Sequence, residues 1–127
     1  MKTFHRISLI LSPIALAVLI FFLSSQNYEN APLGFFLGDK IAHFFVFGIL
    51  AFLIFRALSN GFKSRASAST FTIATMLTMF YGATDEFHQS FVFGRQCETG
   101  DLFADALGAI IFGAFCYYFQ KRKFQGK

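Results

Sequence analysis

The sequence is poor in the residues that soluble proteins place on their surfaces. Only 14% of its 127 residues are charged, whereas a soluble domain averages about 25%. Apolar residues make up 55% of the chain, and phenylalanine alone occurs 21 times. So few polar side chains could not cover so much apolar surface in water. The composition therefore excludes an ordinary soluble domain and favours a protein whose solvent is lipid.

Cysteine is also scarce, because the chain contains only Cys97 and Cys116. Two cysteines are too few for a disulfide framework, and a helical stretch between them would hold them beyond the roughly 7 Å Cα separation that a disulfide tolerates. We expect both to be free thiols. Tryptophan is missing, and no basic patch is interleaved with exposed aromatic residues, so the formal net charge of +4 does not indicate a nucleic-acid partner.

Four long apolar runs stand where a soluble protein would have charged surface. They span about residues 7–23, 41–58, 66–84 and 102–119, and the third is poorer and rich in serine and threonine. Each has about the 17 to 25 residues that a helix needs to cross a bilayer. Their continuity argues against barrel strands, in which apolar and polar residues alternate. The sequence therefore predicts an all-α membrane protein, a single domain over 1–127 built as a bundle of four transmembrane helices.

The first run also has features of a signal peptide, because Lys2, His5 and Arg6 give it a basic start. No clear small-x-small cleavage site follows Leu23, where the chain continues with Ser24. We therefore expect a retained helix.

Charged residues are distributed unevenly between the ends of the four runs. Lys40 and Arg95 fall at one set of ends, together with all seven acidic residues. The other nine basic residues fall at the opposite ends: Lys2, Arg6, Arg56, Lys63, Arg65, Lys121, Arg122, Lys123 and Lys127. Because positive charge is retained in the cytoplasm, we expect both termini to be cytoplasmic and the acidic residues to face outward.

The second run opens with a polar segment at residues 39–43. Asp39 is a candidate N-cap, since its carboxylate can accept from free backbone N–H groups. His43 falls about one turn inside, where it can be a core residue, a base or a ligand. Lys40 is one of the two outer basic residues.

The third run ends or continues in a second polar segment at residues 85–89. If this segment is helical, Asp85, His88 and Gln89 share a face, whereas Glu86 points elsewhere, toward another helix. Interfacial solvation is the simple alternative to a site.

The fourth run adds two carboxylates one turn apart. Asp101 can cap the helix, but Asp105 lies inside it, where a carboxylate costs up to about 2.5–3.5 kcal/mol at the helix centre. Asp105 should therefore face the bundle and pair with Arg95, Lys40 or His43. Arg95 itself can hold a carboxylate or phosphate with its planar fork, or fix its loop to a nearby acid. Small residues recur at four-residue spacing and permit close helix approach: Ala104 with Gly108, and Ala109 with Gly113.

The order of these residues resembles the VanZ-like membrane protein family, over about residues 39–113. The resemblance rests on Asp39-Lys40-x-x-His43-Phe44, Asp85-Glu86-x-His88-Gln89, Arg95, and Asp101-x-x-x-Asp105-x-x-Gly108. Phe93 stands where the family often has Pro, and Asp105 where Asn is frequent. The resemblance implies a multi-pass protein of the bacterial inner membrane. The family's namesake is associated with low-level resistance to the glycopeptide teicoplanin.

We interpret the polar set as an outward-facing site that binds or processes an envelope component, such as a lipid-linked precursor. The candidate catalytic residues are His43, Glu86 and His88, because histidine titrates near neutral pH. The candidate substrate-binding residues are Asp39, Lys40, Asp85, Gln89, Arg95, Asp101 and Asp105. A divalent metal would suit the same groups, although their spacing identifies none.

Two other interpretations remain open. In the first, the chain is a non-catalytic membrane module whose polar groups hold the helices together and which works through a protein partner. In the second, it is a proton-coupled transporter, which is disfavoured because no polar run continues through the inner halves of the helices.

Overall fold

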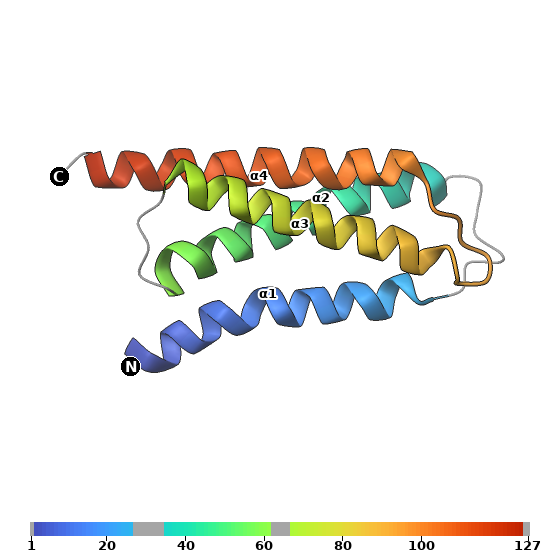
Figure 1. Cartoon of the computed structure of the whole chain (residues 1–127), viewed down its shortest axis with the longest axis horizontal. Coiled ribbons are helices and arrows are strands. Elements are labelled where there is room, and N and C mark those ends of the chain that lie inside the picture. The colour runs from blue at the N-terminus through green and yellow to red at the C-terminus, as the bar shows by residue number, and fades with distance from the viewer. Residues whose placement is uncertain (1, 27–34, 62–66, 126–127) are drawn as a thin grey trace.

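Four α-helices and one short π-helix make up the part of the chain that the structure describes. The computed structural model describes residues 2–26, 35–61 and 67–125, with backbone only for residues 2, 35–37, 61 and 124–125. The helices are α1 (Lys2–Ser24), α2 (Phe35–Arg56), η1 (Ala57–Gly61), α3 (Ala68–Gln89) and α4 (Thr99–Gln125) (Figure 1). No strand occurs within these ranges, and the predicted all-α fold is confirmed.

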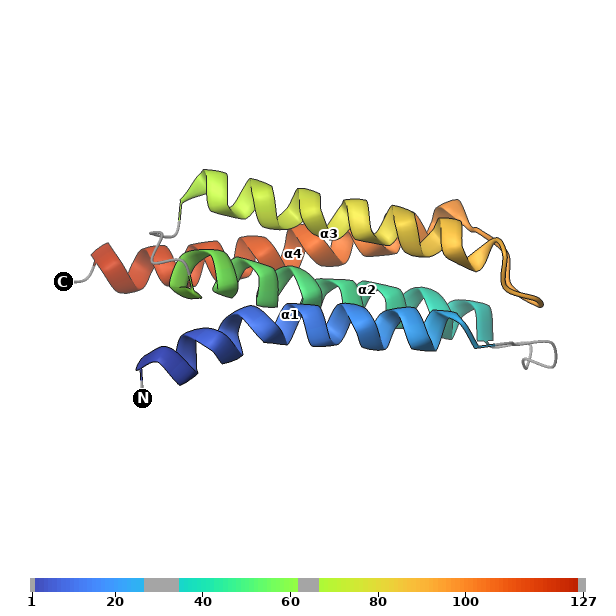
Figure 2. The same cartoon turned by 60° about the horizontal axis from the view of Figure 1, so that its bottom comes forward.

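The helices lie side by side along a common direction. α4 packs most extensively against α2 and also contacts α3, whereas α1 lies at the edge of the bundle against α2 and η1 (Figures 1 and 2). The N-terminal end of α1 and the C-terminal end of α4 lie at the same end of the bundle. The connection between α3 and α4 lies at the opposite end.

Three of the helices are long and apolar enough to cross a membrane, judged by length and composition. They are Thr3–Ser24, Gly38–Asn60 and Thr99–Lys123. Their outer surfaces carry large exposed side chains such as Phe4 and Phe115, which lipid would cover. α3 has a comparable length of 22 residues but a more polar composition, so the fourth span remains a prediction.

The ends of the helices differ from the expected ones. α3 begins after Ser67, whose hydroxyl accepts from the backbone N–H of Thr70 at 3.1 Å, and it continues through the polar segment to Gln89. α2 begins at Phe35 and α4 at Thr99. The N-cap assignments of Asp39 and Asp101 were therefore wrong, because both residues lie inside their helices and their carboxylates pair with basic side chains instead.

Glycine brings α2 and α4 into close contact. A Cβ at Gly108 would come 2.1 Å from the carbonyl oxygen of Phe44, and one at Gly48 would come 2.6 Å from the ring of Phe112. The predicted close approach at Ala104 and Gly108 is thus confirmed for Gly108. Because this contact lies next to His43 on α2, it fixes how the polar residues of the two helices face each other.

Apolar contacts complete the interior in two places. Ile20 of α1 packs with Phe47 and Leu50 of α2. Phe55 of α2, Ala74 of α3 and Cys116 of α4 form a second group nearer the other end. Cys97 is exposed and Cys116 is buried, and both are free thiols as predicted.

Candidate functional site

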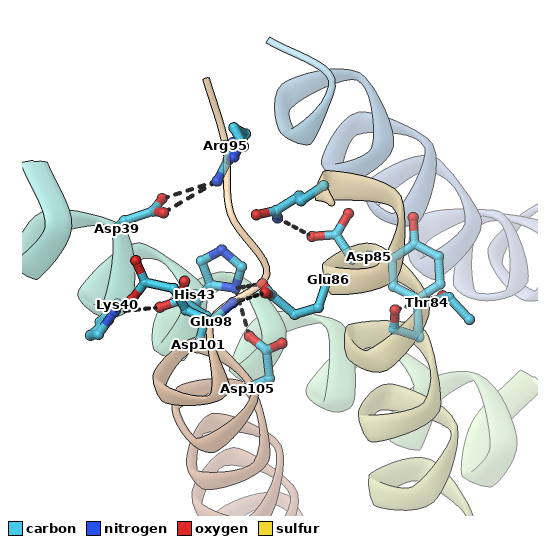
Figure 3. Close-up of polar contacts among 12 residues, drawn as sticks. Asp39, Lys40, His43, Thr84, Asp85, Glu86, Arg95, Glu98, Asp101 and Asp105 are labelled. Carbon is cyan, nitrogen blue, oxygen red and sulfur yellow. Dashed lines mark hydrogen bonds and ion pairs between the residues drawn. The ribbon is translucent and has the colours of Figure 1, made fainter. Parts of the chain in front are cut away.

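Nine of the ten predicted site residues lie together at the end of the bundle opposite the termini (Figures 1 and 3). They come from the start of α2, the end of α3, the loop that follows it and the start of α4. This outer cluster, as we call it, consists of Asp39, Lys40, His43, Asp85, Glu86, Gln89, Arg95, Asp101 and Asp105, with Glu98 as an additional member.

A buried histidine–carboxylate pair lies at the centre of the outer cluster. Nδ1 of His43 lies 2.9 Å from Oδ1 of Asp105, and the two residues are 7% and 1% exposed. Oε1 of Glu86 lies 3.9 Å from the same nitrogen. The ring of Phe47 stacks on that of His43 with centroids 5.6 Å apart. Of the three partners predicted for Asp105, His43 is the one that the structure provides.

Two basic side chains of the outer cluster, Lys40 and Arg95, each form ion pairs with acidic residues. Nζ of Lys40 contacts a carboxylate oxygen of Glu98 and lies 3.1 Å from Oδ1 of Asp101. Nη2 of Arg95 donates to Oδ2 of Asp39 at 3.2 Å. The predicted acids for fixing the loop of Arg95 were Asp85, Glu86 and Asp101, but the ion pair among the described residues is formed with Asp39 of α2.

The end of α3 contributes three buried polar side chains. Nε2 of Gln89 donates to Oδ2 of Asp85 at 2.9 Å, as their one-turn spacing predicts. Oε2 of Glu86 accepts from the backbone N–H of Glu98 at 2.9 Å and so ties α3 to the start of α4. Among the described residues, Oε1 of Glu86 and Oδ2 of Asp105 have no hydrogen-bond partner.

His88 lies apart from the outer cluster. Its Nε2 lies 3.0 Å from the hydroxyl of Ser25, and its ring lies against Phe21 with centroids 4.6 Å apart. Both partners belong to α1 or the residues that follow it. His88 therefore faces α1, while Glu86 points toward α2 and α4.

Two contributors to the cluster were missed at the sequence level. Glu98 lies one residue before α4 and pairs with Lys40, and the gathering of all acidic residues at one set of helix ends was the pattern that could have revealed it. Gly82 is the second, because a Cβ there would come 2.6 Å from Oδ2 of Asp105. Nothing in the local sequence marks Gly82 as the residue that leaves room for this carboxylate.

A pocket of about 160 Å³ opens beside the histidine. Its apolar lining comes from α1 and α2 and consists of Ile20, Leu23, Ala42, Val46 and Phe47. Its polar lining consists of Ser24, Asp39, His43, Asp85, Gln89 and Arg95. The pocket thus joins an apolar surface to buried ionisable groups.

Comparison with known protein families gives a match over most of the chain. The model of the VanZ/LLP1 family matches residues 9–121. The chain belongs to the VanZ/LLP1 family. Searches of curated proteins and of solved structures found no match. The resemblance predicted from the polar motifs is confirmed, and the matched region also includes α1.

In this VanZ/LLP1 protein, acids outnumber bases in the outer cluster. Asp39 pairs with Arg95, and Glu98 and Asp101 share Lys40. Three buried carboxylates then surround His43 without a lysine or arginine contact among the described residues: Asp85, Glu86 and Asp105. A cluster of three buried carboxylates favours the binding of a positive charge, either a proton or a metal cation.

The exposed thiol of Cys97 reports on this charge from the loop between α3 and α4. Partial desolvation raises the pKa of Cys97, and the negative charge of Glu86 raises it further. This thiol offers a chemical probe of the outer cluster.

Proposed function

We propose that this VanZ/LLP1 protein binds an envelope component, a membrane lipid or a lipid-linked precursor, in the pocket beside His43. The observation that carries the proposal is the pocket's mixed lining, in which apolar side chains occur together with buried ionisable ones. A lipid has the same mixed character, because an acyl or prenyl chain joins a polar head group. Ligand pockets commonly combine apolar lining with a few placed polar groups.

Arg95 is the group that we expect to contact an anionic head group. Its side chain is 7% exposed and lines the pocket. Its partner Asp39 is more accessible, at 22%, and Nη2 contacts both carboxylate oxygens at 3.2 and 3.5 Å. A phosphate or carboxylate can accept from the guanidinium fork as Asp39 does. Arg95 would thus orient the ligand, with Gln89 nearby as a neutral donor.

The charge distribution supports an outward-facing pocket. Described basic residues occur near the ends of the helices opposite the outer cluster: Arg6, Arg56, Lys121, Arg122 and Lys123. Because basic residues flank membrane helices on the cytoplasmic side, we propose that this end is cytoplasmic and that the pocket opens on the other side.

The second candidate function is a membrane module that acts through a protein partner. An apolar groove between α2 and α4 favours it, lined by Ile49, Phe52, Ile111, Phe112 and Phe115. A partner helix could lie there, and the ion pairs of the outer cluster would then serve only to join the helices. The two candidate functions differ in the expected effect of substitutions in the outer cluster on the amount of protein in the cell.

The test uses a deletion strain that carries single substitutions and is challenged with teicoplanin and other envelope-directed agents. Arg95→Gln and Gln89→Ala change the pocket. Thr84→Ala is the control, since Thr84 is exposed on α3 and its hydroxyl bonds only to its own helix, to the carbonyl of Tyr81. Protein level is followed by blot in the same cells, and lipids that co-purify with each variant are identified by mass spectrometry.

Binding in the pocket predicts that Arg95→Gln and Gln89→Ala accumulate normally but lose both the co-purified lipid and the phenotype. Thr84→Ala should retain both. If the phenotype instead falls in step with protein level, the cluster holds the bundle together and the partner-dependent function is favoured. A phenotype and lipid content unchanged in both pocket variants would refute the proposal.

A further inference from the structure

Among the described residues, the three carboxylates around His43 contact no lysine or arginine. Asp85, Glu86 and Asp105 are each at most 4% exposed, and the two basic residues of the cluster are already engaged by other acids. Gln89 donates to Asp85, but an amide brings no charge. Buried carboxylates without compensating charge are costly. This excess of negative charge is concentrated around His43, beside the pocket.

His43, Asp85 and Glu86 are close enough together to act as ligands of one metal ion. One ring nitrogen of His43 and one carboxylate oxygen from each of Asp85 and Glu86 lie within 4.8 Å of one another. They come from two helices, α2 and α3, that are packed together in the bundle. A cation placed among them needs only small side-chain movements to reach ligand distances of about 2.0–2.2 Å.

An unpartnered atom independently points to a ligand. Glu86 is 1% exposed, and its Oε1 has no hydrogen-bond partner among the described residues. This oxygen lies on the side of His43, at 3.9 Å from Nδ1, whereas Oε2 is held by the backbone N–H of Glu98. Leaving a buried acceptor unpaired costs about 1–3 kcal/mol, and more when the group is charged. A cation would satisfy it.

His43 already has the second contact that metal-binding histidines make. Its Nδ1 lies 2.9 Å from Oδ1 of Asp105. When the Nδ1 proton is donated to this carboxylate, Nε2 keeps its lone pair for a metal, and the ring orientation is fixed. Asp105 is in this arrangement a positioning residue, and the absence of a side chain at Gly82 leaves room for its carboxylate.

We propose that His43, Asp85 and Glu86 bind a divalent cation of the Mn²⁺ or Zn²⁺ type, with Asp105 orienting His43. One imidazole and two carboxylates suit these ions, whereas Ca²⁺ takes six to eight oxygen ligands. The cation offsets most of the negative charge of the three carboxylates. It also gives the pocket a positive group beside Arg95, and recruitment of an anionic head group by the ion is the part that rests on the proposed function.

Ion binding is tested on full-length protein in nanodiscs, purified through a tag without histidine and stripped with a chelator. Mn²⁺ alone is titrated and free ion is followed by electron paramagnetic resonance, and Zn²⁺ alone is titrated by calorimetry. Glu86→Gln and Asp85→Asn keep the side-chain shapes and remove ligand charge. His88→Gln is the matched control, because it removes a histidine from the same helix end but outside the ligand set.

We expect one ion per chain in the original protein and in His88→Gln, and at least a hundredfold weaker binding in Glu86→Gln and Asp85→Asn. Asp105→Asn should weaken binding by about 10–100-fold, the usual effect of losing an outer-shell carboxylate. Added ion should raise the unfolding temperature of the original protein and of His88→Gln but not that of Glu86→Gln.

The amide variants should fold, because each removes a negative charge from a crowded group, and the unfolding temperature of the metal-free protein checks this. No stoichiometric binding of either ion by the original protein, or equal binding by a folded Glu86→Gln or Asp85→Asn variant, overturns the inference. Neither ion titration depends on which lipids co-purify with the protein. Ion binding without lipid binding would therefore refute the proposed function alone, and the reverse would refute the metal site alone.

Discussion

Nδ1 of His43 and Oδ1 of Asp105 lie 2.9 Å apart in the interior of the bundle, and the contact joins α2 to α4. The two residues are 62 positions apart in the sequence, and each lies in a helix that is long and apolar enough to cross a membrane. A polar contact placed there stabilises the bundle, because each of the two groups is costly to bury alone. The pair therefore couples the stability of the bundle to the geometry of the outer cluster.

Replacing Asp105 tests the pair directly. Asp105→Ala leaves His43 buried without its partner, and loss of one member of a buried pair costs about 3–5 kcal/mol. Asp105→Asn keeps an oxygen that can accept from Nδ1, so it should cost clearly less. Unfolding followed by circular dichroism in detergent gives the two differences. Equal effects of Asn and Ala would show that the hydrogen bond to His43 contributes little.

Gly108 should tolerate no side chain. A Cβ there would approach the carbonyl oxygen of Phe44 to 2.1 Å, and because this atom is backbone, α2 and α4 must separate. We expect Gly108→Ala to lower the unfolding temperature strongly. Gly38→Ala is the control, since nothing lies within 4 Å of its Cβ position and alanine favours a helix by up to about 1 kcal/mol over glycine. Comparable stability of the two variants would contradict the close helix contact.

Substitutions at Gly82 and Asp105 should have non-additive effects on the free energy of unfolding. A Cβ at Gly82 would lie 2.6 Å from Oδ2 of Asp105, and the contacted atom is the end of a side chain. Gly82→Ala should therefore displace the carboxylate and destabilise the original protein, yet it should cost much less once Asp105 is alanine. A double-mutant cycle on unfolding free energies measures this coupling. Additive effects would mean that the carboxylate does not occupy the space beside Gly82.

The reactivity of Cys97 should depend on Glu86. Partial desolvation and then the Glu86 charge raise the pKa of this thiol, so less thiolate is present at neutral pH and maleimide labelling should reach its maximum rate only at higher pH. Glu86→Gln removes a negative charge that disfavours the thiolate, which lowers the pKa and speeds labelling at any pH below that maximum. Rates are measured in a Cys116→Ala background, with Thr84→Ala as the control. Identical pH profiles for Glu86→Gln and the control would place the charge elsewhere.

Labelling from the two membrane sides tests the fourth span and the orientation. If α3 crosses the membrane, Cys97 and a cysteine at the exposed Asn60 lie on opposite sides. An impermeant maleimide should label Cys97 in right-side-out vesicles and Asn60→Cys, in a Cys97→Ser background, only in inside-out vesicles. Labelling of both from one side would show that α3 does not span.

Apolar run length was sufficient to predict the helices, because a bilayer leaves few other ways to satisfy the backbone. α1, α2 and α4 contain most of the predicted runs, whereas the sequence left open whether the third helix ends before Asp85 or continues to Gln89, as it does in the structure. The small residue at Gly108 correctly indicated a close approach. One-turn spacing correctly paired Asp85 with Gln89. Each of these features is local, or depends on a single helix face.

Contacts between distant segments could not be predicted in the same way. The partner of Arg95 depends on how the loop after α3 lies against α2, and no spacing rule relates two segments 56 residues apart. His88 faces Ser25 because α1 lies on that side of α3, an arrangement that no spacing rule within α3 contains. The choice of His43 among three possible partners for Asp105 likewise required the relative position of α2 and α4.

The approach at Gly108 also acts as an axial stop. It brings the backbones of α2 and α4 together at the level of Phe44, and a side chain on either side of this level would oppose sliding of one helix along the other. A shift of one turn, about 5.4 Å, would carry His43 past Asp105 and dismantle every pairing above it. The absence of a side chain at Gly108 therefore sets the level in the bundle at which the charged groups of α2 and α4 meet. It places no constraint on the size of the lipid-facing phenylalanines.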